Sequence, residues 1–162
     1  MNAADIKADD VLGWAKEKMD TRRLPLPKKP RGRDPQFDFP DDPDALGSNE
    51  LGQLMMRMAS YLGYTQRLLG IADSELALVE AEYRLRVNTA GLEARERLGR
   101  VAADVVEAAV LAENGDLVPL YERRLRLMTV CIQLKSRLSM YEKFYQALSR
   151  ELSRREMESR AS

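Results

Sequence analysis

Histidine is absent from this sequence of 162 residues. Because histidine is the commonest general base and the commonest metal ligand near neutral pH, its absence removes the usual means of acid–base catalysis and metal binding. The single cysteine, Cys131, excludes an intramolecular disulfide and a cysteine metal cluster. Glycine-rich phosphate loops of the G-x-x-x-x-G-K-[ST] and G-x-G-x-x-G types are also missing. We therefore expect no catalytic residues, no metal and no cofactor, and we do not expect an enzyme.

Long apolar runs are missing as well. No stretch approaches the roughly 18 apolar residues that a membrane-spanning helix needs. The first residues, MNAADIKADDVLGW, lack the basic region and apolar core of a signal peptide. A single thiol fits a reducing compartment. These features predict a soluble cytoplasmic protein with no membrane partner.

The strongest positive pattern is a heptad repeat, which predicts one helix over residues 48–87, about 60 Å long. Its apolar seam is formed by Leu51, Met55, Met58, Leu62, Thr65, Leu69, Ala72, Leu76, Val79 and Tyr83. Two flanking rows, Leu54, Tyr61, Leu68 and Tyr64, Ile71, Leu78, Leu85, widen the stripe. A stripe of this width needs at least two partner helices, which predicts assembly with other helices.

The rest of the chain predicts two further helices. Asn88–Gly91 favours a break, residues 92–112 a second helix, and Asn114–Asp116 a turn. A third helix with its own heptad rows is expected to run to about Glu158, with Cys131 in its apolar face. The predicted fold is all-α: a long antiparallel helical hairpin with a shorter intermediate helix, assembling into a homo-oligomeric bundle or ring.

The N-terminal part differs in composition. Residues 21–47 hold six of the seven prolines, residues 21–33 hold six basic and no acidic residues, and residues 34–50 hold six acidic and no basic residues. We predict that residues 1–47 form a proline-rich, charge-segregated and largely flexible tail, with a short helix within residues 1–20. Residues 48–160 would form the helical oligomerisation and DNA-binding domain. Trp14 either anchors the tail on the body, the commoner role, or stacks on a base or a partner.

Arginines are the residues best suited to a binding site. In a hairpin, the end of the first long helix lies near the start of the last, and this would bring five arginines to one end of the molecule. They are Arg84, Arg86, Arg123, Arg124 and Arg126. Arginine suits phosphates, and the neighbouring Tyr83 offers a ring on which a base can stack. The alternative is that these are surface arginines paired with nearby glutamates.

The stretch DPDALGSNELGQLMMRMASYLGYTQRLLGIADSELALVEAEYRLRV, followed by a weaker middle and a helix ending YEKFYQALSRELSRR, resembles the UvsY-type recombination mediators of phages. The resemblance covers residues 44–156. It implies a small, ring-forming helical oligomer that binds single-stranded DNA and helps load a RecA-like recombinase onto DNA covered by single-strand-binding protein. It also implies that Arg84-Leu85-Arg86 is the basic-x-basic pair that contacts DNA.

The predicted function is therefore recombination mediation in phage homologous recombination and DNA repair. Single-stranded DNA, the recombinase, the single-strand-binding protein and further copies of the chain are the expected partners. The alternative is a non-enzymatic coiled-coil adaptor, such as an assembly chaperone or scaffold, that does not bind nucleic acid.

Overall fold

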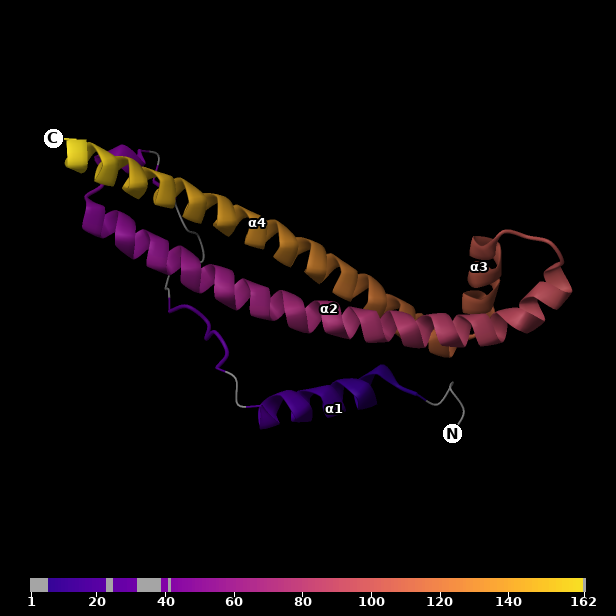
Figure 1. Cartoon of the computed structure of the whole chain (residues 1–162). Helices are drawn as coiled ribbons and strands as arrows, with labels where there is room; N and C mark the ends of the chain where they lie inside the picture. The colour runs from indigo at the N-terminus through magenta and orange to yellow at the C-terminus, as the bar shows by residue number, and fades with distance from the viewer. Residues whose placement is uncertain (1–5, 23–24, 32–38, 41, 162) are drawn as a thin grey trace. The chain divides into compact units, whose positions relative to one another are not determined.

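The computed structural model describes residues 6–22, 25–31, 39–40 and 42–161. Over these residues the chain is helical and contains no strand, which confirms the all-α prediction (Figure 1). The helices are α1 (Ala8–Thr21), α2 (Ser48–Leu98), α3 (Ala103–Glu113) and α4 (Val118–Ala161), with 3-10 turns η2 (Pro43–Ala45) and η3 (Gly115–Leu117). None of these helices has an apolar segment long enough to cross a membrane. Residues 1–5, 23–24, 32–38 and 41 of the predicted tail lie outside the described residues.

Helix α2 is longer than predicted, because the break expected at Asn88–Gly91 does not exist. The helix runs without interruption from Ser48 to Leu98, a length of 51 residues. Within it, the hydroxyl of Thr89 donates to the carbonyl of Leu85. Gly99 ends it, with a positive φ of 73° and its N–H bonded to the carbonyl of Arg95. This left-handed conformation favours glycine and is a common helix terminator. The second predicted helix was also wrong in extent, since α3 begins only at Ala103.

The predicted heptad seam is confirmed along α2. Every member of one row, spaced by seven residues, is buried; the row consists of Leu51, Met58, Thr65, Ala72 and Val79. The same period holds on α4, where Cys131 is buried and therefore behaves as a core residue. A seven-residue repeat keeps one face of a long helix turned towards its partner, so the sequence alone located this face correctly.

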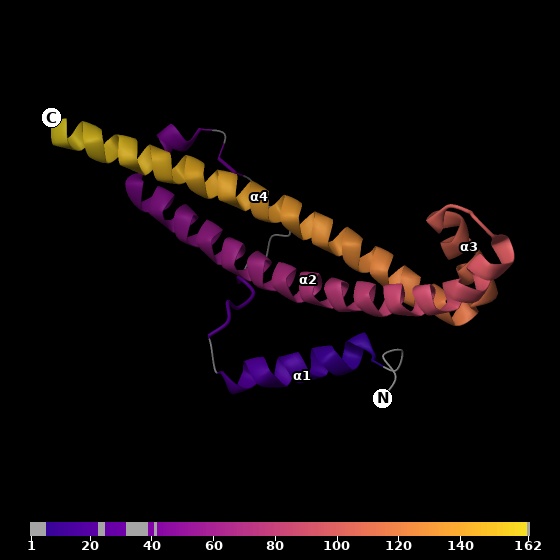
Figure 2. The same ribbon diagram turned by 45° about the vertical axis from the view of Figure 1, so that its right-hand side comes forward.

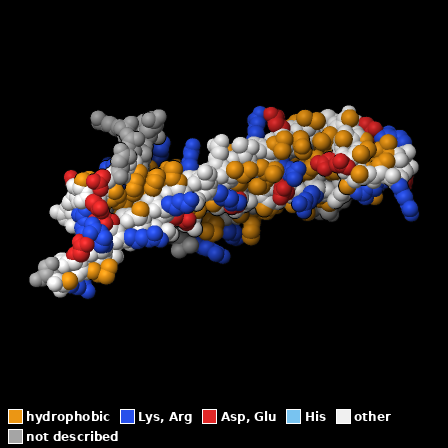
Figure 3. All heavy atoms as spheres, turned by 90° about the horizontal axis from the view of Figure 1, so that it is seen from above, with side chains coloured by type: hydrophobic (Ala, Val, Ile, Leu, Met, Phe, Trp, Pro, Cys, Tyr) orange, Lys and Arg blue, Asp and Glu red, His pale blue; other side chains and the backbone are white. Residues whose placement is uncertain are grey.

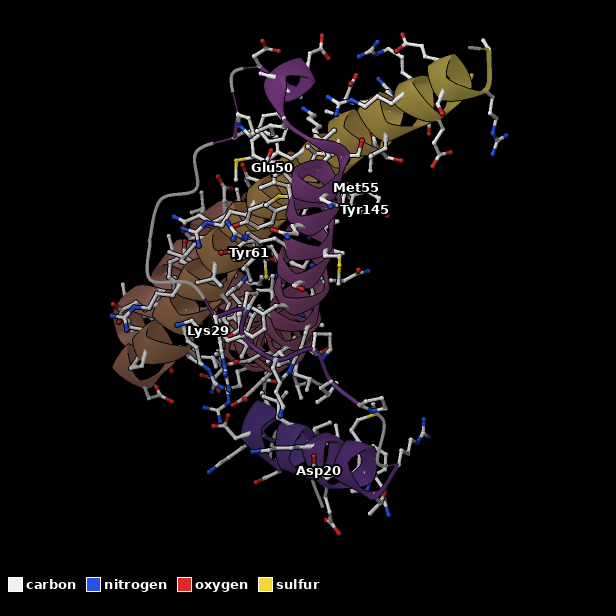
Figure 4. All side chains as sticks on the ribbon, turned by 90° about the vertical axis from the view of Figure 1, so that its left-hand side faces the viewer. Asp20, Lys29, Glu50, Met55, Tyr61 and Tyr145 are labelled. Carbon is white, nitrogen blue, oxygen red and sulfur yellow. The ribbon has the colours of Figure 1, made fainter. Side chains whose placement is uncertain are left out.

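The chain divides into two compact units, each containing part of α2 and part of α4. Unit 2 comprises Pro25–Gly70 and Ile132–Ser162, and its core is built on Leu51, Met58 and Leu148. Met55, Tyr61 and Tyr145 pack against this core (Figure 4). The ring of Tyr61 stacks on that of Tyr141, with centroids 5.3 Å apart. The helices are antiparallel here, because early α2 residues contact late α4 residues.

Part of the predicted tail packs on this core. The ring of Phe39 stacks on that of Phe144 with a centroid distance of 4.4 Å, and Leu46 lies against the same cluster. Pro27 approaches Gly63 so closely that a Cβ at position 63 would lie 3.4 Å from its Cγ. A residue of the N-terminal segment therefore lies against the backbone of α2 at Gly63.

Unit 1 comprises Met1–Leu24 and Ile71–Cys131. Helix α3 folds back against the end of α2 (Figure 2), with a core of Ala94, Val106, Val110 and Leu117. Gly91 permits the contact, because a Cβ there would lie 3.4 Å from Cγ1 of Val106. Tertiary packing thus fills the helix face at the position where local propensity favoured a break.

Helix α1 confirms the short N-terminal helix, but Trp14 does not anchor it. The indole is 61% exposed, whereas Ala8 in the first turn is 3% exposed. The alternation of Lys and Glu or Asp around Trp14 leaves its helix face polar. The anchor of α1 is its first turn, where Ala8 is buried.

Candidate nucleic-acid interface

Tyr83 lies at the centre of the region where the sequence predicted DNA contacts. It is 3% exposed, and its hydroxyl donates a 2.5 Å hydrogen bond to Oε1 of Glu107 on α3. Burial, followed by the bond to Glu107, raises the pKa of Tyr83 well above its usual range. Its ring contacts that of Tyr121 on α4. Tyr83 therefore joins three helices, and its ring offers no free face to a base.

Two of the five predicted arginines bridge α4 to α2. Nη2 of Arg123 lies 2.8 Å from Oε1 of Glu75, and Nε of Arg124 lies 3.2 Å from Oε1 of Glu80. The guanidinium of Arg124 also stands over the ring of Tyr83, 5.5 Å from its centroid. These contacts hold the antiparallel pair in register, so the two side chains have a structural role.

Two more of the five are paired within their own helices. Arg86 bonds Glu82 at 2.8 Å, and Arg126 bonds Glu122 at 2.5 Å, each four residues away. Such i,i+4 pairs contribute only tenths of a kcal/mol and open readily. The interpretation as arginines paired with nearby glutamates therefore describes four of the five positions.

Arg84 is the exception. It is exposed, and among the described residues it has no ion-pair partner. It lines a shallow groove of about 140 Å³ between α2 and α3, together with Asn88 and Arg95. Arg95 is likewise exposed and has no carboxylate partner within the described part of the chain. Two guanidinium groups, one amide and the carboxylate of Glu107, which accepts the hydrogen bond from Tyr83, thus border a single hollow.

Helix geometry explains this arrangement. Arg84, Asn88, Gly91 and Arg95 follow one another at spacings of four, three and four residues, so they share one face of α2. That face is turned to α3, whose residues Ala103, Val106 and Glu107 form the opposite wall. Asn88 and Arg95 were not predicted as site residues, because the break expected at Asn88–Gly91 would have separated Arg95 from Arg84. Continuing the heptad spacing through residue 95 would have found both.

A larger hollow of about 520 Å³ lies between α2 and the turn before α4, but its charges are mixed. Its arginines, Arg86 and Arg97, are paired with Glu82 and Glu113, respectively. Three acidic residues, Glu93, Glu113 and Asp116, also line it. This balance makes it a weaker anion site than the smaller groove. No set of three or more potential metal ligands converges anywhere in the described residues.

Figure 3 shows that lysine and arginine side chains are distributed over the surface among hydrophobic ones. The structure places Arg124 over the ring of Tyr83 and Arg84 in the groove beside α3. It pairs Arg123 with Glu75, two turns before Tyr83 on α2, and leaves Arg126 paired within its own helix. Comparisons with models of known families, with curated proteins and with solved structures found no match for this chain.

Proposed function

We propose that this protein is a non-enzymatic recombination mediator, which binds single-stranded DNA as a homo-oligomer and helps load a RecA-like recombinase. The observation that carries the proposal is the groove bordered by Arg84, Asn88 and Arg95, in which neither guanidinium has a carboxylate partner among the described residues. The resemblance to UvsY-type mediators is the reason for proposing single-stranded DNA as the ligand and a RecA-like recombinase as the partner. The protein would act in the cytoplasm, beside single-strand-binding protein.

The groove suits a sugar–phosphate backbone better than a base. Arginine presents several N–H donors in a planar fork that matches phosphate oxygens, and the amide of Asn88 adds a neutral donor. Tyr83, in contrast, is buried, so base stacking would have to come from elsewhere. The binding we propose is therefore largely independent of sequence and sensitive to salt.

One groove gives few phosphate contacts, so affinity depends on assembly. Several protomers along one strand would place their grooves in succession, and their contacts would combine through a high effective concentration. The same oligomer would cover apolar side chains that one chain leaves exposed. On α4 these include Val118, Leu125 and Val130. Arg86, Arg123, Arg124 and Arg126 would contribute only where their ion pairs open.

A coiled-coil adaptor without nucleic-acid binding is the second candidate. It is favoured by the pairing of four of the five predicted arginines with carboxylates, which neutralises much of the basic surface. The exposed apolar side chains would then serve a protein partner.

Fluorescence anisotropy with labelled oligo-dT at low and moderate salt tests the proposal. We expect the double variant R84A/R95A to bind roughly tenfold or more weakly than wild type, since each charge-assisted hydrogen bond contributes on the order of 1.5–3 kcal/mol. The dependence of log K on log salt should also become shallower, by about 0.7 for each phosphate that the variant no longer neutralises.

The matched control is R57A/R137A, which removes two exposed arginines of unit 2 that have no ion-pair partner within the described residues. An equal decrease in affinity in both double variants would mean that net charge alone governs binding and would remove the groove assignment. Absence of binding by the intact wild-type oligomer at low salt would favour the adaptor.

A further inference from the structure

Within unit 1, helix α1 is held to α2 and α4 by its first turn. The N–H of Ala8 donates a 2.8 Å hydrogen bond to Oε2 of Glu82 on α2, and Oδ1 of Asp9 lies 2.7 Å from Nη2 of Arg123 on α4. Ala8 is buried, whereas Trp14 and Met19 further along the helix are exposed. Docking of α1 thus rests on two polar contacts, one small buried side chain and the partly buried Val11, Leu12 and Ala15.

Arg123 is shared between two carboxylates. Glu75 on α2 and Asp9 on α1 both bond its Nη2, so one positive charge faces two negative ones. Hydrogen bonding to Arg123 holds the pKa of Asp9 below its usual range, so the pair is ionised at neutral pH. In this state two carboxylates already bind the guanidinium of Arg123, so a phosphate would have to take the place of one of them.

The two carboxylates differ in how easily they can leave. Glu75 is part of the long helix α2 and bonds Arg123 through both Nε and Nη2. Asp9 makes one contact, and its side chain is 69% exposed. Exposed ion pairs contribute about 0–1 kcal/mol, so the Asp9 contact is the one that an anion can displace.

We propose that α1 is a displaceable acidic strap, in which Asp9 occupies the position on Arg123 that a backbone phosphate of single-stranded DNA takes when the strand binds. The inference rests on the proposed function and adds its regulation: DNA binding and α1 docking exclude each other at Arg123. A strand also held by Arg84 and Arg95 in the same unit has the advantage of several linked contacts over the single carboxylate. By linkage, DNA weakens α1 docking by the factor by which α1 weakens DNA binding.

The first test compares D9N with D10N by anisotropy with labelled oligo-dT. The two variants remove the same charge from adjacent positions, but Asp10 has no ion-pair partner among the described residues. We expect D9N to bind about three- to tenfold more tightly than wild type, with a salt slope steeper by about 0.7. Loss of the Asp9 charge leaves Arg123 opposed by Glu75 alone, so that Nη2 can contact one more phosphate. D10N should change affinity less than twofold.

The outcomes separate the strap from the proposed function. Binding by wild type with equal effects of D9N and D10N would overturn the strap and leave the function intact. Binding by D9N alone would support both. If neither wild type nor D9N binds at low salt, the proposed function fails, and the competition fails with it.

A second measurement follows α1 itself. Hydrogen exchange of the peptide containing Ala8 and Asp9 should be faster in D9N than in wild type or D10N, with no DNA present. Saturating oligo-dT should accelerate exchange of the same peptide in wild type. Unchanged exchange in wild type at saturating oligo-dT would overturn the strap even though the strand is bound.

Discussion

Arg155 on α4 donates a 2.6 Å hydrogen bond to the main-chain carbonyl of Leu46, which lies just before α2. The same guanidinium reaches the carbonyls of Pro43 and Asp44, both at 3.1 Å. The planar fork thus binds three carbonyls at once, and one of them, that of Pro43, also accepts the N–H of Leu46. One side chain thereby fixes η2 and the entry to α2 against the end of α4 in unit 2.

Replacing Arg155 with lysine should destabilise the protein by about 1–3 kcal/mol, because a lysine ammonium cannot reproduce this fork. Urea unfolding followed by circular dichroism measures the change. R150K is the control, since Arg150 is exposed on the same helix and has no ion-pair partner among the described residues. Equal urea midpoints for the two variants would show that the contacts of Arg155 with the carbonyls do not contribute to the free energy of unfolding.

Glu151 should make stability depend on pH. Hydrogen bonds from Arg154, and then from Arg155, lower its pKa to about 2. Because the folded-state pKa lies below the ordinary value of 4.5, ionised Glu151 stabilises the fold above that value. This contribution disappears as the pH falls from about 4.5 towards 2.

The measurement for Glu151 is the urea midpoint between pH 6 and pH 2, within a range set by the pKa shift. E151Q should be less stable than wild type at pH 6, and the difference should shrink as the pH falls. E156Q, at an exposed position of the same helix, should show no such convergence. A constant gap between E151Q and wild type would contradict the assignment.

Two glycines of α2 should respond differently to alanine. Nothing lies within 4 Å of a Cβ built at Gly70, so G70A should stabilise the helix by about 0.5–1 kcal/mol. At Gly91 the new methyl would lie 3.4 Å from Cγ1 of Val106, at the short limit of van der Waals contact, so the stabilisation should be smaller there. Thermal unfolding compares them. Equal stabilisation would mean that α3 does not rest on Gly91, and destabilisation by G70A would mean that another chain occupies the space.

Tyr83 should contribute through its hydroxyl as well as its ring. Y83F removes the hydrogen bond to Glu107 and leaves a half-buried carboxylate without that partner, which should cost about 1–2 kcal/mol in urea unfolding. Y121F is the matched control on the facing ring. Since the ring of Tyr83 is buried, oligo-dT affinity should change little in Y83F when measured under folding conditions. A selective decrease in DNA affinity would instead indicate direct contact.

The sequence predicted those parts of the fold that depend on periodicity. The buried row from Leu51 to Val79 repeats every seven residues, and no tertiary information is needed to see it. The end of α2 was missed because Asn88–Gly91 has poor helix propensity, whereas packing of Val106 on Gly91 decides the structure there.

The site was less predictable than the fold, for a physical reason. Residue type identified the arginines, but the charge of the surface that they form depends on partners far away in sequence. Arg123 and Glu75 are 48 residues apart in the sequence, and Asp9 lies on a third helix, α1. Only the folded arrangement shows that Arg84 and Arg95 have no carboxylate partner among the described residues, while four nearby arginines are paired.

The sharing of Arg123 by Asp9 and Glu75 also has a genetic consequence. Two acidic residues on different helices depend on the same guanidinium, so substitutions at positions 9 and 75 should be epistatic. Once Arg123 is replaced, a further change at position 9 should have little effect on α1 docking. Natural variation at the three positions is therefore expected to be correlated, with replacement of the arginine relaxing the requirement for both acids.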